Sequence, residues 1–271
     1  GVRLVGSEMC IRDRETHMKD CIGIFDSGIG GLSVYEEIRK RLPDENIIYL
    51  ADEANCPYGT KTREEVRAIS IKNIETLMKM GAKLVVIACN TATSSIVDTI
   101  EENPNRLIGV IQPTALAAKQ HSKGRIGLFA TDLTVKSGVY QSYLNNELKF
   151  AEGCSDLVPH IEAHDYNSQE MKEMILSHAE KMKNIDTLIL GCTHFKFIKK
   201  EIQSVLPHVV IVDSGEPTCN ILIDILTKTH PFERNHQDTK TIYVTTGDET
   251  KAREQLKSLH IIFDEIYHKD I

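Results

Sequence analysis

The stretch "LVVIACNTATSS" at residues 84–95 passes directly from apolar residues to a thiol, an amide and hydroxyls. A short apolar run rich in β-branched residues is typical of a strand that is buried on both faces of a parallel sheet. The residues after such a strand usually form a turn rich in Gly, Asp or Pro. Here Cys89, Asn90 and Thr91 follow instead. We therefore predict a strand that ends in a group of chemically active side chains.

A second stretch, "DTLILGCTHF" at residues 186–195, has the same character and ends in Cys192, Thr193 and His194. A cysteine at the end of a strand often serves only as a small apolar packing residue, and that interpretation suits a single example. Two such cysteines, each followed by hydrogen-bonding residues, favour a shared site.

The two cysteines also occupy matching points of an internal repeat. Gly23 precedes Cys89 by 66 positions, and Gly127 precedes Cys192 by 65. A repeat of this length is too long for a solenoid and indicates two similar α/β lobes. Strands that alternate with helices predict a mostly parallel sheet flanked by helices in each lobe. Ligands of such sheets bind beyond the carboxyl ends of the strands, where both cysteines are expected.

Hydrophobic periodicity and turn residues predict the other elements. A helix is predicted over 62–81, where Thr62 and Glu65 can form a capping box and Gly81 can end the helix. The remaining predicted elements are strands at 46–52, 106–113, 208–215 and 241–248 and a helix at 169–184.

The chemistry expected at the strand ends is proton transfer. A helix that begins after each cysteine presents free N–H groups and the positive end of its dipole, so we expect it to lower the pKa of the thiol. The segment "FDSGIGGLS" adds Asp26 and Ser27, and its spacing fits neither a dinucleotide-binding loop nor a P-loop. Two thiols on opposite sides of a small substrate suit a reaction that inverts a carbon centre. Asp26 near Cys89 and His194 near Cys192 are the expected partners of the thiols.

Composition excludes several other classes of protein. The chain has 271 residues, a formal net charge of −7 and no dense Lys/Arg block, so nucleic-acid binding is not expected. No apolar run is long enough to span a bilayer, and we expect residues 1–19 to be an extension outside the fold. The seven cysteines contain no CxxC pair, which predicts no metal site and indicates the reduced thiols of a cytoplasmic protein. Cys56, Cys154 and Cys219 are expected to be packing residues.

Several motifs together resemble those of the cofactor-independent glutamate racemases. The resemblance covers nearly the whole chain after residue 20 and rests on "DSGIGG", "PYG", "CNTA" and "GCTH" in this order. It implies a homodimeric enzyme that interconverts L- and D-glutamate without pyridoxal phosphate or metal and supplies D-glutamate for peptidoglycan. It also implies an active site in the cleft between two lobes, here 20–113 with 213–271, and 114–212.

Carried over to the matching positions, the resemblance makes Cys89 and Cys192 the two acid/base residues and Glu162 an auxiliary acid near Cys192. The residues that would hold the substrate or tune the thiols are Asp26, Ser27, Tyr58, Gly59, Asn90, Thr91, Thr193 and His194. The chain departs from the family pattern after "GCTH", where Phe195-Lys196-Phe197 stands in place of the usual Tyr-Pro-Leu.

Three alternatives remain open at this point. The first is a racemase of the same superfamily that acts on aspartate or another amino acid; the "GCTH" and "DSGIGG" motifs favour glutamate, and a panel of substrates separates the two. A non-catalytic protein that keeps the fold and binds an amino acid or a protein partner is excluded by measurable turnover. A thiol redox protein is disfavoured by the lack of a CxxC pair.

Overall fold

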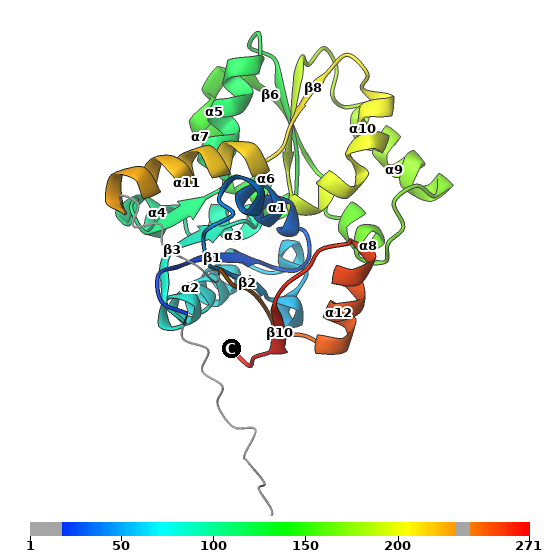
Figure 1. Ribbon diagram of the computed structural model, residues 1–271. Coiled ribbons are helices and arrows are strands. Elements are labelled where there is room, and N and C mark those ends of the chain that lie inside the picture. Colours follow the sequence, from blue (N-terminus) through cyan, green and yellow to red (C-terminus); the bar gives the residue numbers. More distant parts are fainter. Residues whose placement is uncertain (1–17, 231–238) are drawn as a thin grey trace, which may run out of the picture.

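The computed structural model describes residues 18–230 and 239–271, and two parallel sheets form its framework (Figure 1). The larger sheet has the strand order β10-β9-β2-β1-β3-β4, and the smaller sheet has the order β6-β5-β7-β8. The strands are β1 (Cys21–Asp26), β2 (Ile47–Ala51), β3 (Ala82–Ile87), β4 (Leu107–Gly109), β5 (Ile126–Ala130), β6 (Leu148–Gly153), β7 (Thr187–Gly191), β8 (Val210–Val212), β9 (Thr241–Thr245) and β10 (Glu265–His268).

Helices connect these strands and cover the sheets. The α-helices are α1 (Leu32–Arg41), α2 (Arg63–Lys79), α3 (Asn90–Ser95), α4 (Val97–Glu102), α5 (Ile111–His121), α6 (Asp132–Ser137), α7 (Val139–Leu144), α8 (Leu157–Glu162), α9 (Gln169–Ala179), α10 (Lys199–Val205), α11 (Gly215–Thr229) and α12 (Glu249–Ser258). Short 3₁₀-helices are η1 (Glu53–Asn55), η2 (Tyr58–Thr60), η3 (Asn145–Glu147) and η4 (Thr193–Ile198).

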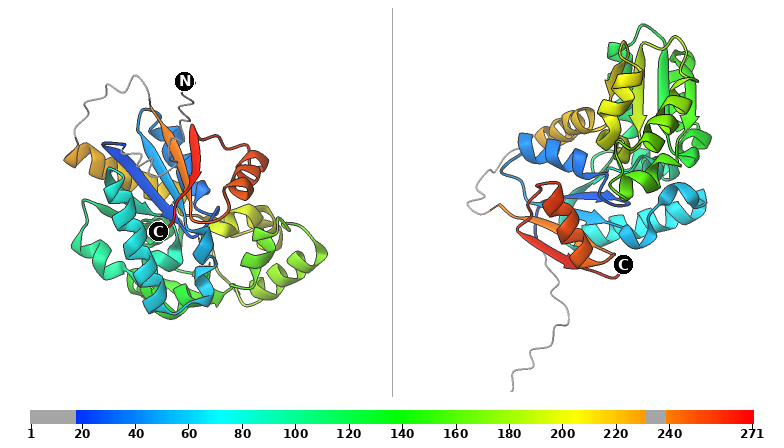
Figure 2. Two further views of the ribbon diagram at one scale, coloured as in Figure 1. Left: turned by 90° about the horizontal axis from the view of Figure 1, so that it is seen from below. Right: turned by 90° about the vertical axis from the view of Figure 1, so that its right-hand side faces the viewer.

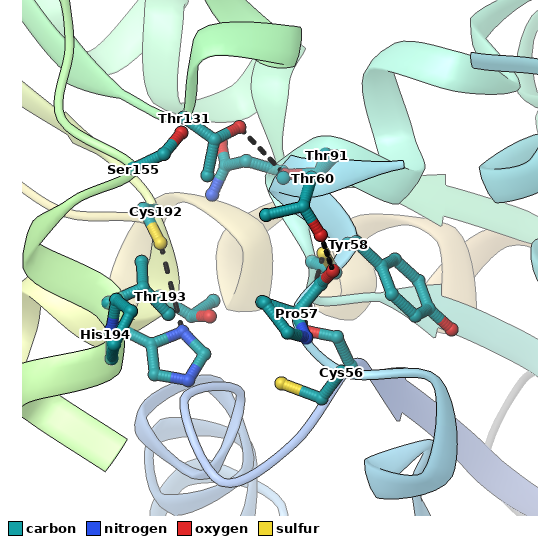
Figure 3. Close-up of a pocket in the computed structure, with 16 residues that line it drawn as sticks. Cys56, Pro57, Tyr58, Thr60, Thr91, Thr131, Ser155, Cys192, Thr193 and His194 are labelled. Carbon is teal, nitrogen blue, oxygen red and sulfur yellow. Dashed lines mark hydrogen bonds between the residues drawn. The ribbon is translucent and has the colours of Figure 1, made fainter. Parts of the chain in front are cut away.

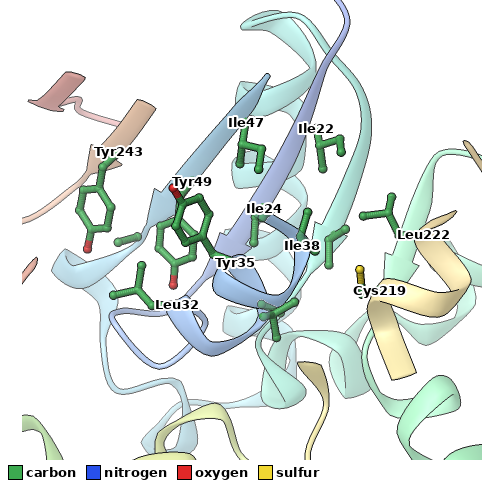
Figure 4. Close-up of a cluster of buried hydrophobic side chains, with 14 of the residues drawn as sticks. Ile22, Ile24, Leu32, Tyr35, Ile38, Ile47, Tyr49, Cys219, Leu222 and Tyr243 are labelled. Carbon is green, nitrogen blue, oxygen red and sulfur yellow. The ribbon is translucent and has the colours of Figure 1, made fainter. Parts of the chain in front are cut away.

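The large sheet is buried on both faces because successive side chains of a strand point to opposite sides. In β1, Ile22 and Ile24 join a core with Ile38 of α1 and Leu222 of α11 (Figure 4). Phe25 of the same strand instead joins the core beneath α2 on the other face. Each fully buried aliphatic or aromatic side chain contributes about 1.5–3 kcal/mol, so both faces of the sheet stabilise the lobe.

The register of the central strands brings the predicted site residues to one edge. Phe25 of β1 is level with Ile87 of β3 and with Leu50 of β2. The chain segments that follow these three residues therefore leave the sheet side by side. Asp26 and Cys89 reach the same edge for this reason, which confirms the strand ends predicted for both.

The capping box predicted for the helix at 62–81 is present. Thr62 accepts a hydrogen bond from the backbone N–H of Glu65, and the Glu65 side chain accepts one from the Thr62 N–H. The helix ends before Gly81, whose φ of +105° is the left-handed conformation that glycine adopts without strain.

Two sequence-based boundaries are wrong. The segment 106–113 is not one strand, because β4 ends at Gly109 and α5 begins at Ile111. Pro113 lies in the first turn of α5, where backbone N–H groups make no intrahelical hydrogen bond. The proline therefore removes no hydrogen bond from the helix. The helix predicted at 169–184 ends at Ala179.

The chain forms two lobes, one for each sheet, as the repeat predicted (Figure 2). It leaves the large sheet after β4, builds the small sheet from β5 to β8, and returns through α11, which packs on α1 and α5. The boundaries at residues 113 and 213 stay a prediction. Residues 1–17 of the expected extension lie outside the described residues. Met18 is buried and its N–H donates to the carbonyl of Met80, so this end of the 1–19 segment belongs to the packed structure.

In residues 18–230 and 239–271, the structure has no helix that is both long and apolar enough to cross a membrane.

Candidate active site

Cys89 lies at the N-terminus of α3, immediately beyond the end of β3. Its Sγ accepts a hydrogen bond from the backbone N–H of Ala92 at 3.5 Å and lies 3.9 Å from Ser27 Oγ. The thiol is buried, with 5% of the residue exposed. This local geometry follows from the sequence "ACNTA", because the helix begins directly after the strand and the cysteine caps it.

The environment of Cys89 nevertheless holds the proton on sulfur. Burial raises the pKa of the Cys89 thiol to about 12, the negative charge of Asp26 acts in the same direction, and the N–H of Ala92 opposes both. The expectation that the helix start lowers this pKa is therefore wrong for the net shift. Loss of water around the sulfur outweighs the one hydrogen bond that the helix supplies.

Cys192 follows β7 and is the first of three linked polar side chains, of which Figure 3 shows Cys192 and His194. Its Sγ lies 3.7 Å from Nδ1 of His194, and Nε2 of His194 is hydrogen-bonded to Glu162. The chain continues as the 3₁₀-helix η4 rather than as the α-helix expected after Cys192. A 3₁₀-helix has three residues per turn. In this turn the imidazole of His194 lies against the sulfur of Cys192.

The charge of His194 is set by these two partners. Burial disfavours the imidazolium, but the Cys192 sulfur and the Glu162 carboxylate outweigh burial and hold the pKa of His194 well above its ordinary value. Burial also raises the pKa of Glu162, yet the hydrogen bond from His194 reverses this and leaves the pKa below its usual range. Both shifts favour the imidazolium form of His194 and the carboxylate form of Glu162.

Asp26 of the first lobe is hydrogen-bonded to Thr193 of the second. Its carboxylate is fully buried and accepts hydrogen bonds from the N–H groups of Gly28 and Gly31 and from the Thr193 hydroxyl at 3.3 Å. Burial raises the pKa of Asp26, whereas the charge of His194 lowers it. Asp26 acts on Cys89 through its charge.

A small cavity of about 40 Å³ lies between the lobes, and both thiols line it. The lining residues come from the segments that follow the strands, including η2, η4, α8 and the start of α3: Ser27, Cys56, Pro57, Tyr58, Gly59, Thr60, Cys89, Asn90, Thr91, Thr131, Ser155, Val158, Pro159, Cys192, Thr193 and His194.

Comparison with known proteins identifies the family. A family model described as Asp/Glu/hydantoin racemase matches residues 22–221. The chain belongs to this family. It is 36% identical to the glutamate racemase of Bacillus cereus over 83% of this chain and 87% of that protein. The structure superimposes on a glutamate racemase of Bacillus anthracis with a TM-score of 0.86 and 31% identity, covering 93% of this chain and 98% of the other. A glutamate racemase of Francisella tularensis in complex with D-glutamate gives a TM-score of 0.85 at 26% identity, with 93% and 98% of the two chains covered.

The chain is thus an amino-acid racemase, and the cavity collects most of the residues proposed from its sequence. Asp26 and Glu162 are not among the lining residues, but Asp26 is hydrogen-bonded to Thr193 and Glu162 to His194, which are. Tyr58 lines the cavity, but its hydroxyl points away to the Asp52 carboxylate at 2.5 Å (Figure 3).

Seven cavity residues of this racemase were not among the site residues proposed from the sequence: Cys56, Pro57, Thr60, Thr131, Ser155, Val158 and Pro159. Cys56, which was expected to be a packing residue, lines the cavity. Thr131 and Ser155 belong to the second lobe and face Gly59 of the first, with Thr131 also 2.9 Å from the hydroxyl of Thr91. Thr131 directly follows β5, so the strand-end argument used for the cysteines could have found it.

Proposed function

We propose that this racemase interconverts L- and D-glutamate by a two-base mechanism in which Cys89 and Cys192 exchange protons with the α-carbon. The observation that carries the proposal is that two thiols, one from each lobe, line one small cavity. The relatives of Bacillus cereus and Bacillus anthracis are named glutamate racemases, which supports glutamate as the substrate.

The proposed reaction moves one proton on each face of the substrate. One cysteine, as thiolate, takes the α-hydrogen, so that the Cα–H bond breaks and an S–H bond forms. The other cysteine, as thiol, donates its proton to the opposite face, which forms the new Cα–H bond and leaves a thiolate. The configuration is inverted, and the roles of Cys89 and Cys192 are exchanged. The reverse reaction uses the same groups in the opposite order.

Neighbouring residues would supply the charges that these steps need. The His194 imidazolium, held by Glu162, can donate a hydrogen bond to a thiolate at Cys192. Asp26 is placed to balance the positive charge of His194 and of a substrate ammonium group. A substrate that fills this cavity would displace its water, which would strengthen each of these interactions.

The substrate carboxylates would be held by N–H and hydroxyl donors. Asn90 and Thr91 belong to the first turn of α3, and Thr193 begins η4 on the other lobe. Ser27 and the backbone of Gly59 complete the proposed binding set. Backbone N–H groups at the start of a helix favour an anion.

We further propose that the product D-glutamate serves peptidoglycan synthesis and that the enzyme works as a homodimer. Both statements rest on the resemblance of the motifs to those of glutamate racemases. Light scattering of the purified protein tests the second, since a homodimer has twice the mass of the 30.5 kDa chain.

The test is circular dichroism of L-glutamate incubated with the purified protein, a reducing agent and EDTA, without pyridoxal phosphate. We expect the signal to decay to zero. Cys89→Ala and Cys192→Ala should each slow this decay at least ~10³-fold, within the range of a lost acid/base group. Cys219→Ala, which removes a buried thiol remote from the cavity, should keep the rate.

Each other outcome changes the proposal. Near-normal turnover in either cavity variant would reject the two-base mechanism. Decay with L-aspartate but not with L-glutamate would keep the mechanism and change the substrate. No decay with any amino acid would favour a binding protein.

A further inference from the structure

The side-chain amide of Asn90 makes a hydrogen bond through its oxygen and none, among the described residues, through its nitrogen. Its Oδ1 accepts a hydrogen bond of 2.7 Å from the hydroxyl of Tyr140. Its Nδ2 is buried and has no hydrogen-bond partner among the described residues. Only 1% of Asn90 is exposed, and the residue lines the cavity between the thiols. A buried amide NH₂ without a partner is costly, so its presence in a cavity indicates that a ligand completes it.

Tyr140 is hydrogen-bonded to the oxygen end of this amide. It belongs to α7 of the second lobe, whereas Asn90 begins α3 of the first, so the hydrogen bond crosses between the lobes. The phenol is 1% exposed, and burial raises its pKa, which keeps the proton on oxygen. If the amide were flipped, its NH₂ would face the phenol, and the phenol proton would lose Asn90 Oδ1 as its acceptor.

We propose that Tyr140 is a positioning residue that orients the Asn90 amide so that Nδ2 donates to a carboxylate of the substrate. The inference rests on the proposed function and adds to it a residue that does not itself line the cavity. Because the orienting bond joins the two lobes, the donor is correctly aimed only when the lobes are together. Substrate affinity and lobe contact are therefore linked through one phenol.

The experiment compares Tyr140→Phe with the wild type in steady-state kinetics. The variant keeps the ring and removes only the hydroxyl. We expect KM for glutamate to rise about tenfold, the size of one weakened hydrogen bond to a charged group, with kcat changed less than about threefold. Tyr143→Phe is the matched control, since it removes a hydroxyl of the same helix that bonds Glu101 at the surface, and its kinetics should equal the wild type.

A double-mutant cycle separates positioning from a general structural effect. In an Asn90→Ala background, Tyr140→Phe should leave KM unchanged, because no amide remains to be oriented. An unchanged KM in the single variant, or an equal increase with and without Asn90, would overturn the proposal. Thermal unfolding of every variant checks that the fold is kept.

The test also separates a failure of this inference from a failure of the proposed function. If the wild type racemises aspartate instead, the same KM comparison with aspartate decides the role of Tyr140. If the wild type turns over no amino acid, the Kd of L-glutamate from calorimetry replaces KM. A Kd that is equal in wild type and Tyr140→Phe, or no detectable binding to either, would also overturn the proposal.

Discussion

His194 is the residue whose charge depends most directly on its neighbours, and Glu162 is the partner that can be changed without touching a thiol. Glu162→Gln removes the carboxylate that helps to hold the pKa of His194 well above its usual value. We expect the alkaline limb of the kcat/KM profile to move to lower pH. Rates measured from pH 6 to 10 check this, with the exposed Glu170→Gln as control. If the alkaline limb did not move, His194 would have no part in the proposed proton transfers.

The same pair predicts how stability depends on pH. The folded pKa of His194 is raised, so its contribution to stability is complete below its unfolded value of about 6.5 and is lost as the pH rises through the folded value. The difference in unfolding free energy between wild type and Glu162→Gln should therefore be largest near pH 6 and smaller at alkaline pH. Urea unfolding at several pH values measures it, and a difference that grows with pH would contradict the assignment.

Single residues at strand ends could be predicted because strand position alone places them. Cys89, Cys192 and Asp26 each directly follow or end an apolar run, so no long-range information was needed. Tyr140 and Ser155 could not be found in this way. Their roles depend on which helix of the second lobe faces the first, and that is decided by packing between segments distant in sequence.

At the scale of elements, one buried carboxylate holds the loop after β2 in place. Asp52 accepts hydrogen bonds from Tyr58 of η2, Asn73 of α2 and Thr246 after β9. Asp52→Asn replaces one acceptor oxygen by a donor, which must then face other donors. We expect a loss of about 1–3 kcal/mol in unfolding free energy. The exposed Asp44→Asn should stay within about 0.5 kcal/mol of the wild type in urea titrations; equal effects of the two changes would show that the network contributes nothing.

The elements themselves were predictable where their signals were local. The capping box of α2 uses residues three positions apart, and it is formed as predicted. The segment 106–113 was misassigned because a short apolar run has no clear period, and Ile111 is equally suited to a strand and to the buried face of α5. The 3₁₀ turn after Cys192 lies in the segment where Phe195-Lys196-Phe197 departs from the family pattern.

At the scale of the whole molecule, Gly30 of the first lobe packs closely against Thr193 and His194 of the second. A Cβ on Gly30 would overlap with the Thr193 hydroxyl and lie 2.9 Å from Nδ1 of His194. Gly30→Ala should therefore displace the second lobe and lower kcat/KM at least tenfold while the protein remains folded. Gly124→Ala is the control: its φ of +89° makes the change unfavourable by about 1–2 kcal/mol, but no atom lies near it and kcat/KM should not change. An active Gly30→Ala would show that the cleft tolerates separation of the lobes.

The position of β9 in the large sheet has a consequence for synthesis on the ribosome. β2 ends at Ala51, but the strand that pairs with its outer edge begins only at Thr241, after the whole second lobe. At ~5–20 residues per second, roughly ten to forty seconds pass before this partner emerges. The strands of the second lobe are all made within that interval, so the later half of the chain can fold before the earlier half is complete. During this time the nascent chain carries an open, apolar strand edge that another chain could pair with.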